Sequence, residues 1–165
     1  MKGPGDVCTV LACGLAGDVV RNFGEVRLRA LGTSMVPAIL PGDLISVQRA
    51  SMSQISPGEV VLFERDGRVF AHRVIGNAGS LGASQLITRG DRLGYNDPPV
   101  SAAELLGRVT CIERGCRQMQ PPTPLTGWKQ ILGWLLRSSD HATYVYVNLA
   151  ARWSHVISRR AECRA

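Results

Sequence analysis

The sequence predicts a mainly β domain of antiparallel, coiled or barrel-like sheets, with a short helix before it and two helices after it. Between residues 25 and 115, short segments alternate apolar and polar residues, and this period of two is typical of half-buried strands. Turn-forming Gly, Pro and Asp residues separate these segments at hairpin spacing. The rest of the chain has apolar residues at helical spacing instead.

The first predicted element is a short helix that ends near Gly24. Four apolar residues at intervals of four define its expected buried face: Leu11, Leu15, Val19 and Phe23. The segment 7–17 is also the nearest match to a signal-peptide core, but the preceding MKGPGD has one Lys offset by one Asp, so a helix is favoured. No segment reaches the ~18–20 apolar residues of a spanning helix. The sequence therefore predicts no membrane anchor and a cytoplasmic location, with membrane association as the alternative.

Six strands are expected in the domain, at 26–31, 44–48, 60–65, 68–76, 85–88 and 108–114. Asp66 and Gly67 form a tight turn that joins the third strand to the fourth as a hairpin. The segment 101–107 is expected to form a helical turn, because Ser101 is a good N-cap and Glu104 follows it three residues later. Residues 32–43 contain two Gly and two Pro residues, which break any regular element.

The chain is expected to divide into an N-terminal helix at 1–24, a β core at 25–116, a linker at 117–124 and a helical tail at 125–165. Apolar residues recur at helical spacing from Trp128 to Leu136 and again from Tyr146 to Ile157. These two amphipathic helices favour packing against the β domain or a partner. The alternative is a peripheral membrane contact through 125–157, since all three Trp residues lie there.

The composition limits which partners, metals and cofactors the sequence predicts. The 165 residues carry a formal net charge of +6, spread along the chain, so nucleic acid is not expected as a partner. The cysteines number five and have no C-x-x-C spacing, which does not support a disulfide framework or a zinc site. No cofactor and no metal are predicted, and the expected partner is a peptide or protein substrate.

Taken one at a time, the candidate functional residues carry little information. Ser34 lies in a Gly- and Pro-rich turn after a strand, where a hydroxyl and free backbone N–H groups are exposed, but most such serines only form turns. His72 lies in the middle of an apolar strand, where a histidine is usually a satisfied core residue. Asp43, Asp91 and Asp97 each stand in turn sequences.

The combination of these residues is more specific than its parts. The segments SMVPAILPGD, PGEVVLF, AHRVI, TRGD and LGRV occur in this order between Val26 and Val109. The pattern resembles the signal peptidase I superfamily of serine endopeptidases, which includes the LexA-like self-cleaving repressors. In the bacterial and LexA-like members a lysine base precedes the Arg of the third segment, whereas the archaeal and endoplasmic-reticulum type has histidine. Because His72 precedes Arg73, the chain resembles the histidine-type branch, without a membrane anchor.

The resemblance implies that Ser34 is the nucleophile, His72 the general base and Asp97 its acidic partner. It also implies a set of supporting residues around the site: Asp91, Arg73, Met35 and Gly32. The scarcity of lysine agrees with this assignment, because Lys2 and Lys129 are the only lysines and both lie outside the matching segments. A Ser–Lys pair would need a base from elsewhere in the chain.

The implied reaction is acyl transfer from a peptide carbonyl to Ser34, with the backbone N–H of Ser34 holding the oxyanion. Many signal peptidases add a hydroxyl two residues before the nucleophile, where this chain has Gly32. The alternatives are a peptide-binding or regulatory module without turnover, and a self-cleaving LexA-like switch. Phe70 and Val74 share the strand face of His72, so both are expected to wall the substrate cleft.

Overall fold

Seven strands dominate the part of the chain that the computed structural model describes, residues 15–79, 84–123, 141 and 143–149. The strands are β1 Glu25–Arg29, β2 Leu44–Arg49, β3 Val60–Arg65, β4 Arg68–Ala78, β5 Gln85–Arg89, β6 Leu105–Arg114 and β7 Arg117–Met119. A 3-10 helix, η1, spans Met52–Gln54, and residues 15–23 and 143–149 are helical. The mainly β prediction with a helix before the sheet is confirmed.

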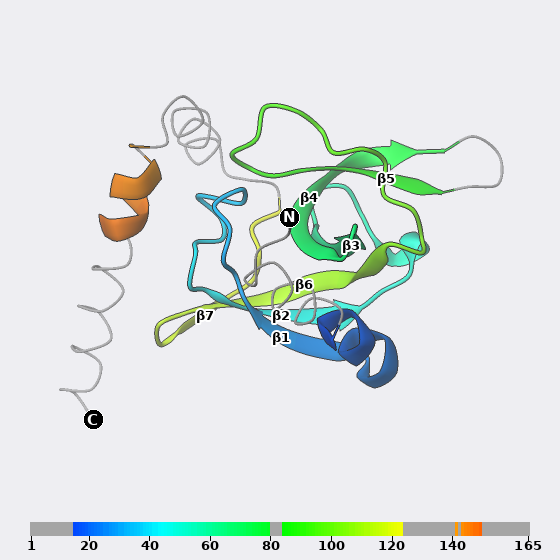
Figure 1. Ribbon diagram of the computed structural model, residues 1–165, viewed down its shortest axis with the longest axis horizontal. Coiled ribbons are helices and arrows are strands. Elements are labelled where there is room, and N and C mark those ends of the chain that lie inside the picture. Colours follow the sequence, from blue (N-terminus) through cyan, green and yellow to red (C-terminus); the bar gives the residue numbers. More distant parts are fainter. Residues whose placement is uncertain (1–14, 80–83, 124–140, 142, 150–165) are drawn as a thin grey trace, which may run out of the picture.

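The strands form one antiparallel sheet in the order β1-β2-β6-β3-β4-β5, with β7 paired to β6. β1 and β5 stand at the two ends of this order and do not pair with each other. The sheet is therefore open and does not close into a barrel. Figure 1 shows it strongly bent, with β1, β2 and β6 running along one side and β4 and β5 along the other.

The β3–β4 hairpin fixes the register of the strand that carries His72. Asp66 and Gly67 both have positive φ, 52° and 68°, as a two-residue turn matched to the twist of the strands requires. The register then pairs Arg65 with Arg68 and places His72 opposite Val61. The sequence thus determines both the turn and the position of the imidazole along the sheet.

Strand β6 lies between β2 and β3, although it follows both of them in sequence. A Cβ on Gly107 would collide with the backbone carbonyl of Gln48, so only glycine permits this approach of β6 to β2. This close approach explains the glycine of the LGRV segment by packing alone.

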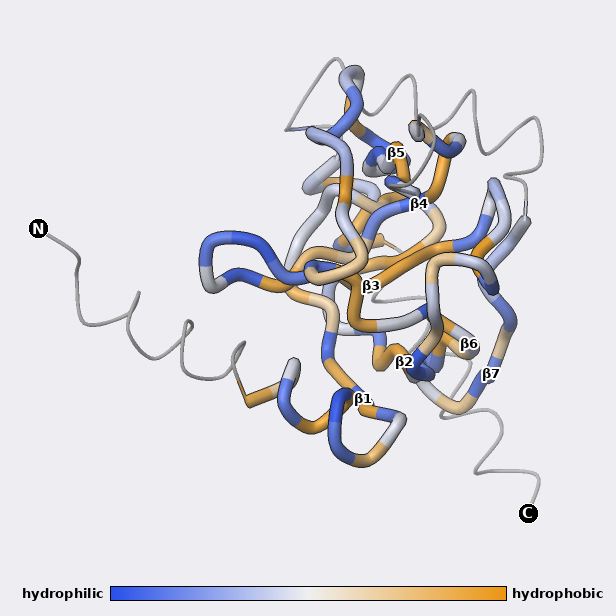
Figure 2. Tube along the Cα trace, turned by 90° about the vertical axis from the view of Figure 1, so that its right-hand side faces the viewer, coloured by the Kyte–Doolittle hydropathy of each residue, from blue (hydrophilic) through white to orange (hydrophobic). Residues whose placement is uncertain are grey.

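Of the three clusters of buried apolar residues in the described part of the chain, two lie on opposite sides of β3. The first contains Val47, Leu62 and Ile112 among others, and the second contains Phe63, Val74 and Leu86. Figure 2 shows the hydrophobic stretches along the strands and the hydrophilic ones in the connecting loops. Alternate residues of β3 thus serve different clusters, which explains why VVLF is apolar throughout.

The helix at 15–23 packs through a different face from the one expected. Leu15 and Phe23 are 67% and 78% exposed, whereas Ala16 and Val20 are buried. A Cβ on Gly17 would lie 2.9 Å from a carboxylate oxygen of Glu64, so the small face lets the helix approach the sheet closely. In the described part of the predicted helix, its presence and its end at Gly24 are confirmed, but the choice of the larger apolar face was wrong. Leu11 and the rest of 1–14 lie outside the described residues.

Two further elements differ from the sequence prediction. The segment 101–107 is not a helical turn throughout: residues 102–104 form a turn and β6 already begins at Leu105. Residues 117–119, expected within a linker, form β7 beside β6. Residues 105–107 pair with β2 and β3, and residues 117–119 pair with β6, so in both places strand pairing outweighs the local preference.

The turn at 101–104 is tied to β3 by an ion pair between Arg65 and Glu104. Arg65 Nε lies 2.5 Å from Glu104 Oε1, while the other carboxylate oxygen accepts hydrogen bonds from the backbone N–H and the hydroxyl of Ser101, each at 2.8 Å. The hydrogen bond from Arg65, with smaller contributions from Ser101, lowers the pKa of Glu104 to about 2. The folded state therefore favours the ionised carboxylate.

We expect Glu104→Gln to destabilise the fold at neutral pH. The lowered pKa of Glu104 means that its contribution is complete above about pH 4.5 and is lost as the pH falls towards about 2. Because the side chain is 26% exposed, solvent screening reduces the expected loss to about 1–2 kcal/mol. Urea unfolding at pH 7 and at successively lower pH measures it. A difference between wild type and variant that stays constant with pH contradicts the prediction, and Glu25→Gln at an exposed position is the control.

Candidate active site

Ser34, His72 and Asp97 lie in contact, although they come from three separate parts of the chain. His72 Nε2 is 3.0 Å from Ser34 Oγ, and His72 Nδ1 is 2.7 Å from Asp97 Oδ2. A carboxylate can only accept, so Nδ1 donates to Asp97 and leaves Nε2 to accept the hydroxyl proton of Ser34. This is the spatial arrangement that the sequence analysis expected of the three residues.

The loop after β1 anchors Ser34 by burying the residues that follow it. Met35 and Val36 are buried, as are Ala38, Ile39 and Leu40. Met35 is thus a core residue, which matches a supporting role at the site. Gly32 is exposed, and a Cβ there would meet nothing within 4 Å. The chain is therefore open to solvent just before Ser34 and tightly packed just after it.

The segment after β5 holds the backbone of Ser34. The N–H of Arg92 donates to the carbonyl of Ser34 at 2.9 Å, and a Cβ on Gly90 would lie 2.8 Å from the same oxygen. The glycine of TRGD is needed for this close approach. Among the described residues, no backbone carbonyl accepts a hydrogen bond from the N–H of Ser34.

His72 is almost completely buried, at 4% exposure, in the middle of β4. Its ring lies 5.9 Å from that of Phe63 and 6.0 Å from that of Phe70, centroid to centroid. Phe70 thus packs against the imidazole, and its place in the wall of a substrate cleft stays a prediction. Val74 is only 1% exposed and belongs to the second core cluster, so the prediction that it walls an open cleft is wrong.

Asp97 is held by Thr88, a residue that the sequence analysis did not single out. The N–H of Asp97 donates to the carbonyl of Thr88 at 2.8 Å, and the hydroxyl of Thr88 donates to Asp97 Oδ2 at 2.7 Å. Thr88 is fully buried. A polar residue at the end of an apolar strand was the available signal, because a buried hydroxyl needs a partner.

Arg73 and Asp91 form a buried ion pair beside the three residues rather than in contact with them. Two parallel hydrogen bonds of 2.7 and 2.8 Å join the guanidinium to the carboxylate, and the side chains are 6% and 2% exposed. Arg73 also donates to the carbonyls of Gly58 and Pro122, each at 2.6 Å. The pair ties β4, which carries His72, to the segment that contacts Ser34.

The helical residues 143–149 pack on the same loop as Ser34. Tyr146 and Val147 contact the buried cluster of Val36 and Leu40, and Arg92 donates to the hydroxyl of Thr143 at 2.9 Å. Figure 1 shows this helix, in orange, well away from the helix at 15–23. The first predicted tail helix and most of the 125–157 segment proposed for membrane contact lie outside the described residues.

No helix in residues 15–79, 84–123 and 143–149 has the length and hydropathy needed to cross a bilayer. In the same described part of the chain, the helices pack on the sheet and on the loop that contains Ser34, through the residues named above.

The arrangement has the parts that acyl transfer to a serine requires. A hydroxyl lies within hydrogen-bond reach of an imidazole nitrogen, and a carboxylate orients the imidazole from its far side. The burial of His72 and the contacts of Asp97 fix both groups before any substrate arrives.

Comparison with models of protein families gives a match. The family model described as Peptidase S24-like matches residues 15–109, more than half of the 165-residue chain. The matched part contains Ser34, His72 and Asp97 together with Arg73 and Asp91. No curated protein matches the chain.

Proposed function

Because the chain belongs to the Peptidase S24-like family, we propose that it is a serine endopeptidase of the histidine-type branch. The family membership agrees with the superfamily resemblance found in the sequence. The histidine-type assignment, the individual catalytic roles and a signal-peptidase-like choice of substrate are the parts that we propose.

The observation that carries the proposal is the pair of contacts on either side of His72. Nε2 reaches Ser34 Oγ at 3.0 Å and Nδ1 reaches Asp97 Oδ2 at 2.7 Å. A serine hydroxyl alone is a weak nucleophile, and an adjacent oriented base is what activates it. The two contacts together place a hydroxyl and a carboxylate on opposite sides of one imidazole, which is the arrangement that this activation requires.

In the proposed reaction, Ser34 Oγ attacks the carbonyl carbon of a peptide bond while His72 Nε2 takes the hydroxyl proton. The carbonyl oxygen becomes an oxyanion, which the backbone N–H of Ser34 stabilises. The C–N bond then breaks as His72 gives its proton to the leaving amine. Water, activated by His72, hydrolyses the ester on Ser34 and restores the enzyme. Asp97 keeps the imidazole oriented and stabilises its cationic form throughout.

Covalent labelling tests the proposal without knowledge of the substrate. We expect a fluorophosphonate probe to form one adduct, located at Ser34 by peptide mass spectrometry. Ser56→Ala, at another exposed turn, should label like wild type, while Ser34→Ala should not label. Labelling that persists in Ser34→Ala contradicts the proposal. Stable peptide binding with no adduct at all would favour the peptide-binding module instead.

A further inference from the structure

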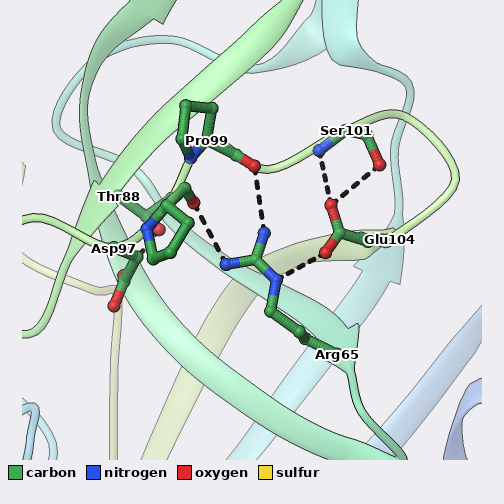
Figure 3. A network of polar contacts seen from close by, with 7 residues as sticks. Arg65, Thr88, Asp97, Pro99, Ser101 and Glu104 are labelled. Carbon is green, nitrogen blue, oxygen red and sulfur yellow. Dashed lines mark hydrogen bonds and ion pairs between the residues drawn. The ribbon is translucent and has the colours of Figure 1, made fainter.

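A cluster of polar contacts holds the chain directly after Asp97 (Figure 3). Arg65 Nη1 donates to the carbonyl of Pro98 at 3.1 Å, and Nη2 donates to that of Pro99 at 3.0 Å. The planar guanidinium can reach both carbonyls at once because its donors have a fixed spacing. One side chain from the end of β3 thus fixes the two residues that follow Asp97.

Arg65 is itself held in a single orientation. Its Nε is 2.5 Å from Glu104, and Glu104 is in turn bonded to the backbone and side chain of Ser101. The guanidinium therefore has partners on three of its nitrogens. This arrangement differs from an exposed arginine that samples many rotamers, and it makes Arg65 a rigid support.

The other side of the same segment is bonded to β5. The N–H of Asp97 donates to the Thr88 carbonyl, and Leu86 and Val100 exchange two backbone hydrogen bonds of 2.8 and 2.9 Å. Pro98 and Pro99 have no N–H to extend this ladder. Arg65 therefore fixes the part of the segment that backbone pairing with β5 leaves unsupported.

Arg65 also contacts the aromatic wall of His72. Its guanidinium carbon lies 5.5 Å from the centroid of the Phe63 ring, and the same ring packs edge-on to His72 at 5.9 Å. A cation at this distance over an aromatic face is attracted to it. Arg65 thus touches the supports of both members of the His72–Asp97 pair.

We propose that Arg65 is a positioning residue for the His72–Asp97 pair, acting through the Pro98 and Pro99 carbonyls and the Phe63 ring. The proposal rests on the proposed function, since it assigns a role in the same reaction. Without the guanidinium, Pro98 and Pro99 lose the group that holds them, and Asp97 shifts with them. A displacement of ~1 Å at a catalytic group can cost about 100-fold in rate.

Kinetic measurements on Arg65→Met, Arg65→Lys and Arg68→Met provide the first test. We expect Arg65→Met to lower kcat by about 10–100-fold with little change in KM. The acid limb of its rate–pH profile should move to lower pH, because a displaced carboxylate stabilises the imidazolium less. Arg65→Lys should not restore the rate, since an ammonium cannot bond both carbonyls in the same way. Arg68, exposed in the same hairpin, is the matched control and should behave as wild type.

Proton NMR in a Ser34→Ala background provides a test that needs no turnover. The Nδ1 proton of His72, bonded to Asp97, should give a far-downfield resonance that shifts or broadens in Arg65→Met and Arg65→Lys but not in Arg68→Met. If Arg65→Met does not fold, as judged by circular dichroism, the resonance and the pH profile of Arg65→Lys test the proposal instead. An unchanged resonance together with an unchanged pH profile overturns the proposal. Absence of any turnover in wild type counts against the proposed function alone, because the resonance still tests Arg65.

Discussion

Ser34→Ala is expected to reduce the rate of peptide cleavage by about 10⁴–10⁶-fold, with little change in KM. The reason is that Ser34 supplies the nucleophile that attacks the peptide carbonyl in the proposed reaction, and its hydroxyl is the group that His72 Nε2 contacts. The residual rate comes from substrate binding and the oxyanion-binding N–H. Single-turnover cleavage of peptides with small residues before the scissile bond measures it, with Ser56→Ala as the matched control.

The double variant Ser34→Ala/His72→Ala makes this prediction sharper. Groups that act as one unit give losses that do not add, so the double variant should be about as slow as Ser34→Ala alone. Equal rates of cleavage by wild type, Ser34→Ala and His72→Ala would contradict the proposed mechanism.

The second large effect concerns stability, at the buried pair of Arg73 and Asp91. Asp91→Ala leaves the guanidinium of Arg73 buried without its carboxylate, which should cost about 3–5 kcal/mol of unfolding free energy. That is a large share of the ~5–15 kcal/mol available to an ordinary domain. Urea unfolding followed by circular dichroism measures the loss.

Two variants control this measurement. Glu113→Ala breaks the Arg27–Glu113 ion pair, in which Arg27 is 58% exposed, and should cost less than about 1 kcal/mol. The double variant Arg73→Met/Asp91→Leu removes both charges together and should recover much of the stability lost in Asp91→Ala. A double variant that is no better than Asp91→Ala would mean that the loss does not come from an uncompensated charge.

Local patterns predicted the β3–β4 hairpin well. The alternation of residues and the Asp66-Gly67 turn are sufficient to set its register, and that register places His72. The helix at 15–23 shows the limit of such patterns, because the sheet accepts the small face of Ala16, Gly17 and Val20 rather than the larger apolar one. The spacing of apolar residues predicts a helix, but it does not predict how closely that helix packs on the sheet.

The site was predictable only where residues belonged to an ordered set of motifs. Ser34, His72 and Asp97 were expected to meet, and their contacts agree with that expectation. Arg65 was missed because its hydrogen-bond partners are 33 to 39 residues away. Thr88 was missed although its partner Asp97 is nine residues away, because only the fold shows that its hydroxyl is buried. Leu105–Gly107 and β7 were missed for a similar reason: they are strands because β6 has neighbours on both sides.

The place of β6 in the sheet has a consequence for how the chain acquires its shape during synthesis. β2 precedes β3 in sequence, yet the two are joined through β6, which is made later. Ser34 and His72 are 38 residues apart and lie in the parts that β6 connects. A chain emerging from the ribosome therefore cannot complete the sheet until Leu105–Arg114 has been synthesised and inserted. Such pairing between distant segments makes folding slow, and a chain interrupted before Leu105 should be inert as well as unstable.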